Sequence, residues 1–222
     1  MNVTPESVRE LLHSETMGDR LRGVNQLRQL EPAIALELIL PTIQDSSARV
    51  RYAAVSQMAS LGKLDRDLAL TVLRDRLLND SETDVQAAAA DSLAGLQLTE
   101  AFEELQQIYY NTSEWLLKLS IVAALGELGD SRSFAMLEDA LNSSESLIKT
   151  AAIGSFGELG DQRATALIIP YATDADWQIR HRVAQALGLL GGPEVRPILE
   201  TLAQDEVSPV AQTAQVSLSA VV

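Results

Sequence analysis

The sequence predicts an all-α protein, an α-solenoid of about seven stacked two-helix repeats, because it copies itself at a fixed interval. Leu125-Gly-Glu-Leu-Gly-Asp130 returns 31 residues later as Phe156-Gly-Glu-Leu-Gly-Asp161, and a looser copy, Leu187-Gly-Leu-Leu-Gly-Gly192, follows at the same distance. Self-similarity with a period of this size is typical of stacked repeat proteins. No segment shows the strict apolar and polar alternation of a strand.

Helical spacing inside each repeat is the second observation. In each repeat, the first apolar residue of the second helix serves as an anchor. Apolar or small residues recur three, four, eight and eleven positions after this anchor, and that spacing is one face of an α-helix. The segment that starts at Asp19 aligns with the one that starts at Val50, which gives seven repeats. The anchors are Val50, Val85, Leu117, Ile148, Ile179 and Val210.

The first helices and their boundaries follow from caps and breakers. Thr4 can cap the first helix, with Pro5 in its first turn. Pro41 and Pro170 should shorten the ends of their helices. Gly62, Gly129 and Gly160 stand where a helix must stop and where a left-handed cap suits glycine. After the helix that starts at Thr4, we expect first helices over 31–43, 65–78, 100–110, 133–141, 163–171 and 193–203.

Composition narrows the class of protein. The net charge is −14, which argues against nucleic acid as a partner, since phosphates require clustered Lys and Arg. There is no cysteine, and no window reaches about 18 uninterrupted apolar residues, so we expect neither a thiolate metal site nor membrane insertion. The two histidines lie in different repeats, and no metal-ligand spacing is present. We expect one solenoid domain over residues 1–222, without a signal peptide and cytoplasmic.

The second helices should line the concave wall of such a solenoid. Their exposed stripe is expected two, six and nine positions after each anchor, which places Tyr52, Asp91, His181 and Gln185 at the ends of a row of small residues. Such a surface suits an inserted helix or a planar ligand. An alternative interpretation is that Ala and Gly serve only tight helix packing.

Paired charges and tryptophans also recur with the repeat. Asp45 and Arg51 are six residues apart, as are Asp174 and Arg180; we interpret them chiefly as a structural ladder in which the acid caps a helix and the base bonds to an adjacent repeat. Trp115 and Trp177 both precede an anchor by two positions. They either pack between repeats or, with Trp177 the better candidate beside Arg180 and His181, offer a flat binding surface. His13 should be an exposed residue at a helix end.

The repeat motif resembles the HEAT-like repeats of the phycobilin lyases of cyanobacteria and red algae. Asp174-Ala-Asp-Trp-Gln-Ile-Arg180, followed by Val183-Ala-Gln-Ala-Leu-Gly188, matches this pattern closely, and the resemblance covers roughly residues 19–218. Gln86 and Ala211 replace the arginine of the motif in two repeats. The short chain is most similar to members that act in phycobilisome degradation.

The resemblance implies a protein that binds phycobiliprotein subunits or their open-chain bilin, phycocyanobilin, in the concave groove. Arg180, His181 and Tyr52 would then meet propionates or carbonyls, and Asp91 would accept from pyrrole N–H groups. No evident acid or base for bond cleavage is present, so at most a weak lyase-like activity is expected. The alternative is an adaptor that docks proteins and binds no pigment. The apolar last repeat, from Val207 to Val222, predicts self-association or fraying at that end.

Overall fold

The computed structural model describes residues 3–220, and these residues contain seven helix pairs and no strand. Residues 3–120 and 121–220 form two compact units, with the boundary inside α8. The predicted all-α solenoid architecture is therefore confirmed. The first helices of the pairs are α1 (Pro5–Leu12), α3 (Pro32–Ile39), α5 (Arg66–Asn79), α7 (Phe102–Asn111), α9 (Ser133–Leu141), α11 (Ala164–Ile168) and α13 (Val195–Leu202).

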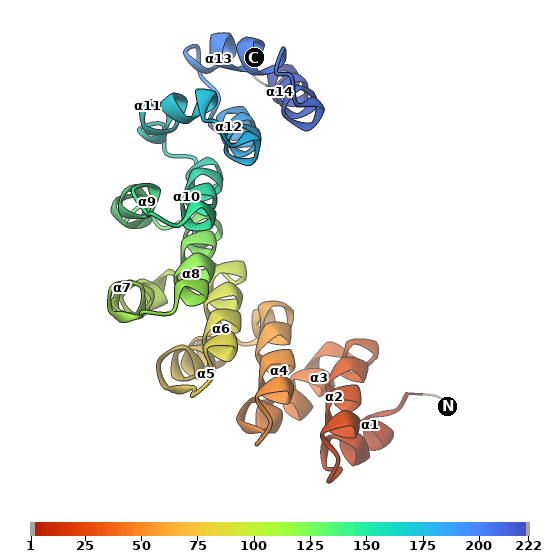
Figure 1. The fold of residues 1–222 in the computed structure, drawn as a ribbon. Helices are drawn as coiled ribbons and strands as arrows, with labels where there is room; N and C mark the ends of the chain where they lie inside the picture. The colour runs from red at the N-terminus through yellow and green to blue at the C-terminus, as the bar shows by residue number, and fades with distance from the viewer. Residues whose placement is uncertain (1–2, 221–222) are drawn as a thin grey trace. The chain divides into compact units, whose positions relative to one another are not determined.

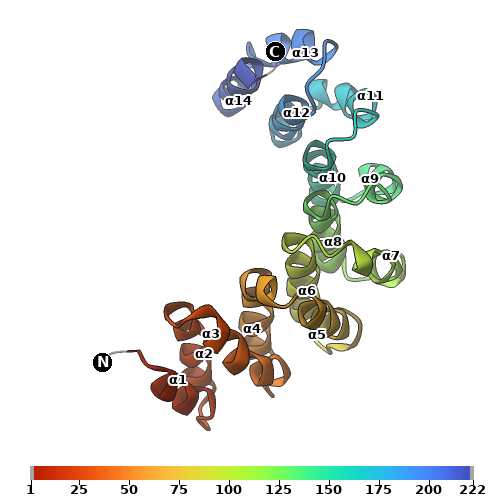
Figure 2. The same ribbon diagram turned by 180° about the vertical axis from the view of Figure 1, so that it is seen from behind.

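The second helices of successive pairs stack on one another within each unit. In the second unit α10, α12 and α14 follow one another along one side, and α9, α11 and α13 lie along the other (Figures 1 and 2). In the first unit α2 packs on α4, and α4 on α6. The second helices are α2 (Met17–Gln26), α4 (Ala48–Leu61), α6 (Thr83–Gly95), α8 (Trp115–Leu128), α10 (Ser146–Leu159), α12 (Trp177–Leu190) and α14 (Ser208–Ala220).

The caps and prolines bound the first helices as predicted. Thr4 is the N-cap of α1, where its hydroxyl accepts from the backbone N–H of Ser7 and Pro5 opens the helix. Pro41 ends α3 in a short 3₁₀ helix, Leu40–Gln44, and Pro170 does the same after α11 in Ile169–Thr173. A proline cannot donate the intrahelical hydrogen bond, so the α-helix stops one turn early.

The glycines at helix ends divide into two kinds. Gly129 and Gly160 each have a φ of 71°, the left-handed conformation predicted for them. Gly62 follows the end of α4 but has a φ of −62°, so the predicted left-handed cap is wrong there. A Cβ on Gly62 would approach Leu96 and Ala69 to 2.7 Å. Glycine stands at that position because neighbouring side chains fill the space, and not because the backbone turns.

The core follows the predicted helical face. All six anchors are at most 4% exposed, and the residues four positions after them, from Ala54 to Ala214, are completely buried. Successive second helices are also joined by a recurring hydrogen bond. The hydroxyls of Ser92, Ser155 and Ser217 donate to the carbonyl oxygens of Val55, Val122 and Ala184 at 2.8–2.9 Å, each one helix pair earlier.

A ladder of arginine and aspartate joins adjacent repeats, as the sequence predicted. The predicted capping role of Asp45 and Asp174 is wrong, because the N-caps of α4 and α12 are Ser47 and Asp176. Each arginine forms two hydrogen bonds to the aspartate of the next repeat, with a shortest N–O distance of 2.7 Å. Each aspartate also accepts the backbone N–H two residues after it, before a second helix begins. The pairs are Arg20–Asp45, Arg51–Asp80 and Arg180–Asp205.

Candidate functional site

A hollow in the second unit is lined only by second helices, α10, α12 and α14. Its volume is about 660 Å³, which lies in the range of small-molecule sites. Its floor consists of small residues such as Gly154 and Ala186, and its apolar walls include Leu189 and Val216, which are 64% and 71% exposed. The lining residues are Gly154, Glu158, Arg182, Gln185, Ala186, Gly188, Leu189, Gln212, Thr213, Val216, Ser217 and Ala220.

Arg182 and Glu158 give this hollow one charge of each sign. Arg182 lies against Gly154, where an added Cβ would come within 3.0 Å of its Cδ, and its Nη1 donates to Gln185 Oε1 at 3.1 Å. Burial raises the pKa of Glu158, the Arg182 charge lowers it, and the neighbouring Glu127 raises it again. The hollow therefore offers a guanidinium donor and a carboxyl group whose ionised form is disfavoured.

Three of the predicted site residues form a row on α12 that leads to this hollow. Trp177, His181 and Gln185 are spaced by four residues and so lie on one face of the helix. The rings of Trp177 and His181 meet edge to face with centroids 6.4 Å apart, and Gln185 lines the hollow. Burial, and then the charge of Arg182, lowers the pKa of His181, so its imidazole is neutral at pH 7.

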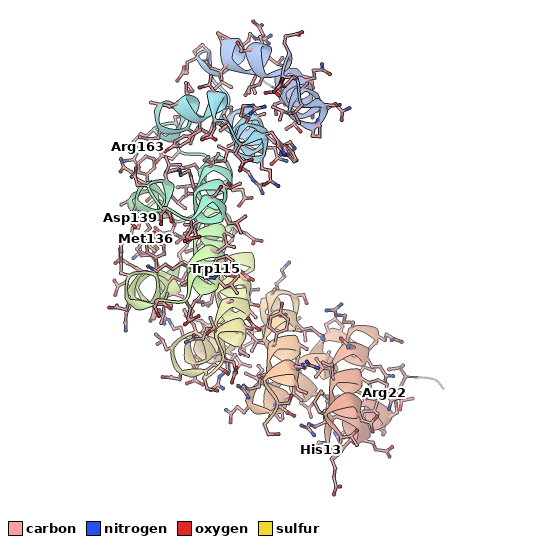
Figure 3. All side chains as sticks on the ribbon, in the orientation of Figure 1. His13, Arg22, Trp115, Met136, Asp139 and Arg163 are labelled. Carbon is pink, nitrogen blue, oxygen red and sulfur yellow. The ribbon has the colours of Figure 1, made fainter. Side chains whose placement is uncertain are left out.

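Neither tryptophan is a core residue. Trp177 is 42% exposed and Trp115, the first residue of α8 (Figure 3), is 44% exposed. His13 is exposed at the C-terminal end of α1, as predicted, and its Nδ1 lies 2.8 Å from the carbonyl oxygen of Arg9.

Arg180, by contrast, belongs to the ladder. Its guanidinium bonds to both carboxylate oxygens of Asp205 and donates to the carbonyl oxygen of Asp174 at 2.8 Å. Its side chain is 12% exposed. These bonds occupy the donors that a ligand would need, so we assign Arg180 to the stability of the stack.

Tyr52 and Asp91 come together in a second hollow, inside the first unit. This hollow has a volume of about 310 Å³ and lies on α4, α6 and α8. Tyr52 is 48% exposed, and Asp91 is also exposed. The lining residues are Tyr52, Thr83, Asp84, Ala87, Ala88, Asp91, Leu116, Leu117, Leu119 and Ser120.

Part of the predicted exposed stripe is buried. Ala94, Gly126 and Gly157, nine positions after their anchors, are buried. The two glycines pack against the next second helix. A Cβ on Gly157 would come within 2.7 Å of the Ala186 Cα. For Gly126 and Gly157, the alternative interpretation of tight helix packing is therefore confirmed.

Arg182 and Glu158 were not among the site residues predicted from the sequence. Arg182 occupies the position three residues after its anchor, where the other second helices from α4 onward carry Ala, Ser or Thr. That departure from the repeat was the available signal. No similar signal marked Glu158, since Glu127 occupies the equivalent position one repeat earlier.

Residues 3–220 contain no group of three or more His, Asp or Glu residues that could hold a metal ion. No helix in that range is long and apolar enough to cross a membrane.

The stacked helix pairs and their ladder define an α-solenoid repeat protein, and the family comparison agrees with this class. The model of the HEAT repeats family matches residues 6–94, 70–156 and 142–219, and the chain belongs to this family. A search among curated proteins finds no match to the sequence.

Solved structures with the same fold include a chain from a phycocyanin lyase complex. In the complex of CpcE and CpcF of phycocyanin lyase from Nostoc sp. PCC7120, one chain is similar to this one with a TM-score of 0.66 and 19% identity, covering 100% of this chain and 96% of that one. An engineered protein shares the architecture with a TM-score of 0.63 and 17% identity, covering 97% of this chain and 67% of that one. The E. coli protein YibA does so with a TM-score of 0.61 and 14% identity, covering 98% of this chain and 93% of that one. At these identities the likeness concerns the fold.

Proposed function

We propose that this protein binds phycobiliproteins or their open-chain bilin and acts in phycobilisome degradation. The motif from Asp174 to Gly188 supports this proposal because it resembles the repeats of phycobilin lyases. We infer in particular a role like that of the phycobilisome-degradation protein NblB, whose repeats the motif also resembles. The fold shared with a phycocyanin lyase chain is consistent with the same assignment.

The observation that supports a binding site is the hollow of the second unit, because it combines apolar walls with Arg182 and Glu158. A bilin is a planar apolar chain with two propionates and several pyrrole N–H groups. Arg182 would bind a propionate, because a guanidinium recognises a carboxylate through paired hydrogen bonds. The Glu158 carboxyl oxygens would accept from the pyrrole N–H groups, and Leu189 and Val216 would pack against the plane.

The row on α12 extends this site. Trp177 and His181 would contact the ligand beyond Gln185, the neutral imidazole donating to a ring carbonyl. We keep Tyr52 and Asp91 of the first unit as partner-binding residues in a separate hollow. Detachment of the bilin would need a positioned acid or base, and we assign no residue to that step.

The test is to titrate the pure protein with phycocyanobilin and to record the absorption spectrum. A shifted band is expected, with affinity reduced about tenfold in Arg182→Gln, as for loss of one charge-assisted contact. Arg196→Gln, on the first helix α13 and away from the hollow, is the matched control and should bind like the parent.

The same experiment with phycocyanin separates this proposal from the adaptor hypothesis. Co-elution with phycocyanin while free bilin leaves the spectrum unchanged would favour an adaptor that docks protein and binds no pigment. If the protein shows no band shift with the bilin and does not co-elute with phycocyanin, the proposal is rejected.

A further inference from the structure

The hollow of the first unit differs in charge from the bilin site proposed above. Its charged lining residues are the two carboxylates of Asp84 and Asp91, both exposed, and no Lys or Arg is among the lining residues that the structure describes. The second unit, in contrast, places Arg182 in its hollow. The two hollows therefore require ligands of different charge.

The two carboxylates are regularly placed along α6. Asp84 and Asp91 are seven residues apart, which puts them on the same face two turns apart, about 10 Å along the helix axis. Ala87 and Ala88 lie between them and also line the hollow. Their short side chains leave a low floor between two negative ends.

Apolar side chains border this floor on both neighbouring helices. Tyr52 comes from α4, which packs on α6, and is 48% exposed; Leu116, at the start of α8, is 50% exposed. Leu119, one turn further along α8, also lines the hollow. The result is a short trough with apolar walls, small residues below and a carboxylate toward each end.

We propose that this trough docks an amphipathic helix of a partner protein that presents Lys or Arg at two positions seven residues apart. An α-helix laid along α6 repeats with the same period, so its cations at i and i+7 would meet Asp84 and Asp91 together. Aliphatic residues at i+3 and i+4 would lie over Ala87 and Ala88 between Tyr52 and Leu116. Apolar anchors at these spacings are how helices bind in grooves.

The charge of the whole chain favours such a partner over a second copy. With a net charge of −14, two copies repel each other, whereas a basic helix is attracted to the trough and steered toward it. This site lies in the first unit and is independent of the proposed bilin site. Loss of one would therefore leave the other measurable.

The probe is a synthetic, fluorescently labelled helical peptide with Lys at i and i+7 and Leu at i+3 and i+4. Fluorescence anisotropy should show saturable binding that weakens as salt is raised, because exposed ion pairs are screened. The double variant Asp84→Asn/Asp91→Asn should bind about tenfold more weakly, the combined loss expected for two exposed pairs. Tyr52→Ala should also weaken binding, and Glu103→Gln, an exposed acid on α7 outside the trough, should not.

A charge-swapped variant and peptide distinguish a loss of charge complementarity from misfolding of the variant. The variant Asp84→Lys/Asp91→Lys should bind a peptide with Glu at i and i+7 and reject the Lys peptide. The proposal is overturned if the parent protein fails to bind the Lys peptide, or if the asparagine variant binds it equally well. It is also overturned if the protein self-associates without peptide and the asparagine variant does not, since a second copy would then be the occupant.

Discussion

Single residues set the properties of the hollow in the second unit, and Glu158 shows how. Its carboxyl group lies beside Gly126, where a Cβ would come within 2.8 Å of Oε2. Burial raises its pKa above the ordinary value of 4.5, against the opposing effect of Arg182. The ionised form therefore costs some folding stability at neutral pH, and that cost disappears as the pH falls through the raised pKa and below 4.5.

Replacing Glu158 by Gln should consequently stabilise the protein slightly at pH 7, by about 0.5 kcal/mol or less once solvent screening is allowed for. The gain should shrink as the pH is lowered and should vanish near pH 4, where the carboxyl group is protonated in both the folded and the unfolded state. Urea unfolding of both proteins at pH 7, 5.5 and 4 measures it. Glu103→Gln serves as the control, and a gain in Glu158→Gln that grows toward low pH would contradict the argument.

At the scale of helices, close approach is governed by glycines on the second helices. Gly157 of α10 faces the backbone of Ala186 on α12, and Gly126 of α8 faces the backbone of Ser155 on α10 in the same way. The hydroxyl of Ser155 can reach the carbonyl oxygen of Val122 at 2.8 Å because the two helices are this near. Small residues thus fix the spacing at which neighbouring repeats bond.

Gly157→Ala should therefore destabilise the protein by about 1–3 kcal/mol, since the added Cβ would lie 2.7 Å from backbone and force α10 and α12 apart. Gly18→Ala is the matched control. No atom lies within 4 Å of a Cβ at that position of α2, and alanine favours the helix there. Urea midpoints that fall in Gly157→Ala and stay level or rise in Gly18→Ala would agree; equal losses would not.

At the scale of the whole molecule, the chain is a stack in which each repeat depends on its neighbours. The ladder shows this dependence, because Arg51 of one repeat forms an ion pair with Asp80 of the next, and the Asp80 side chain is only 1% exposed. Stability in such arrays is close to a sum of repeat and interface terms. A change in one ladder step should then act locally.

Arg51→Met should cost about 2–3 kcal/mol, because it leaves the buried Asp80 carboxylate with Arg76, 3.3 Å away, as its remaining ion-pair partner. Amide hydrogen exchange should quicken most in α4, α5 and α6 and least in α13 and α14. Arg196→Met, whose ion pair with Glu200 is exposed on both sides, should cost about 0.5 kcal/mol or less. Uniformly faster exchange along the chain would show that the stack unfolds as one block.

The sequence by itself determined the repeat, its helices and the ladder, because these depend on spacing along the chain. Period, caps and prolines are local signals, and charges at fixed offsets such as Asp45 and Arg51 repeat with them. It also placed Tyr52, Asp91 and Gln185 on one stripe of the second helices, whereas the structure divides them between two hollows.

Only the tertiary structure decided which face of each second helix stays open. Gly126 and Gly157 look like exposed positions in the helical pattern, yet they are buried where the next helix approaches. The same packing brings Arg182 and Glu158, from neighbouring repeats, into one hollow, while the bonds to Asp205 withdraw Arg180 from it. Side-chain exposure depends on the distance between helices, and helical periodicity carries no information about that distance.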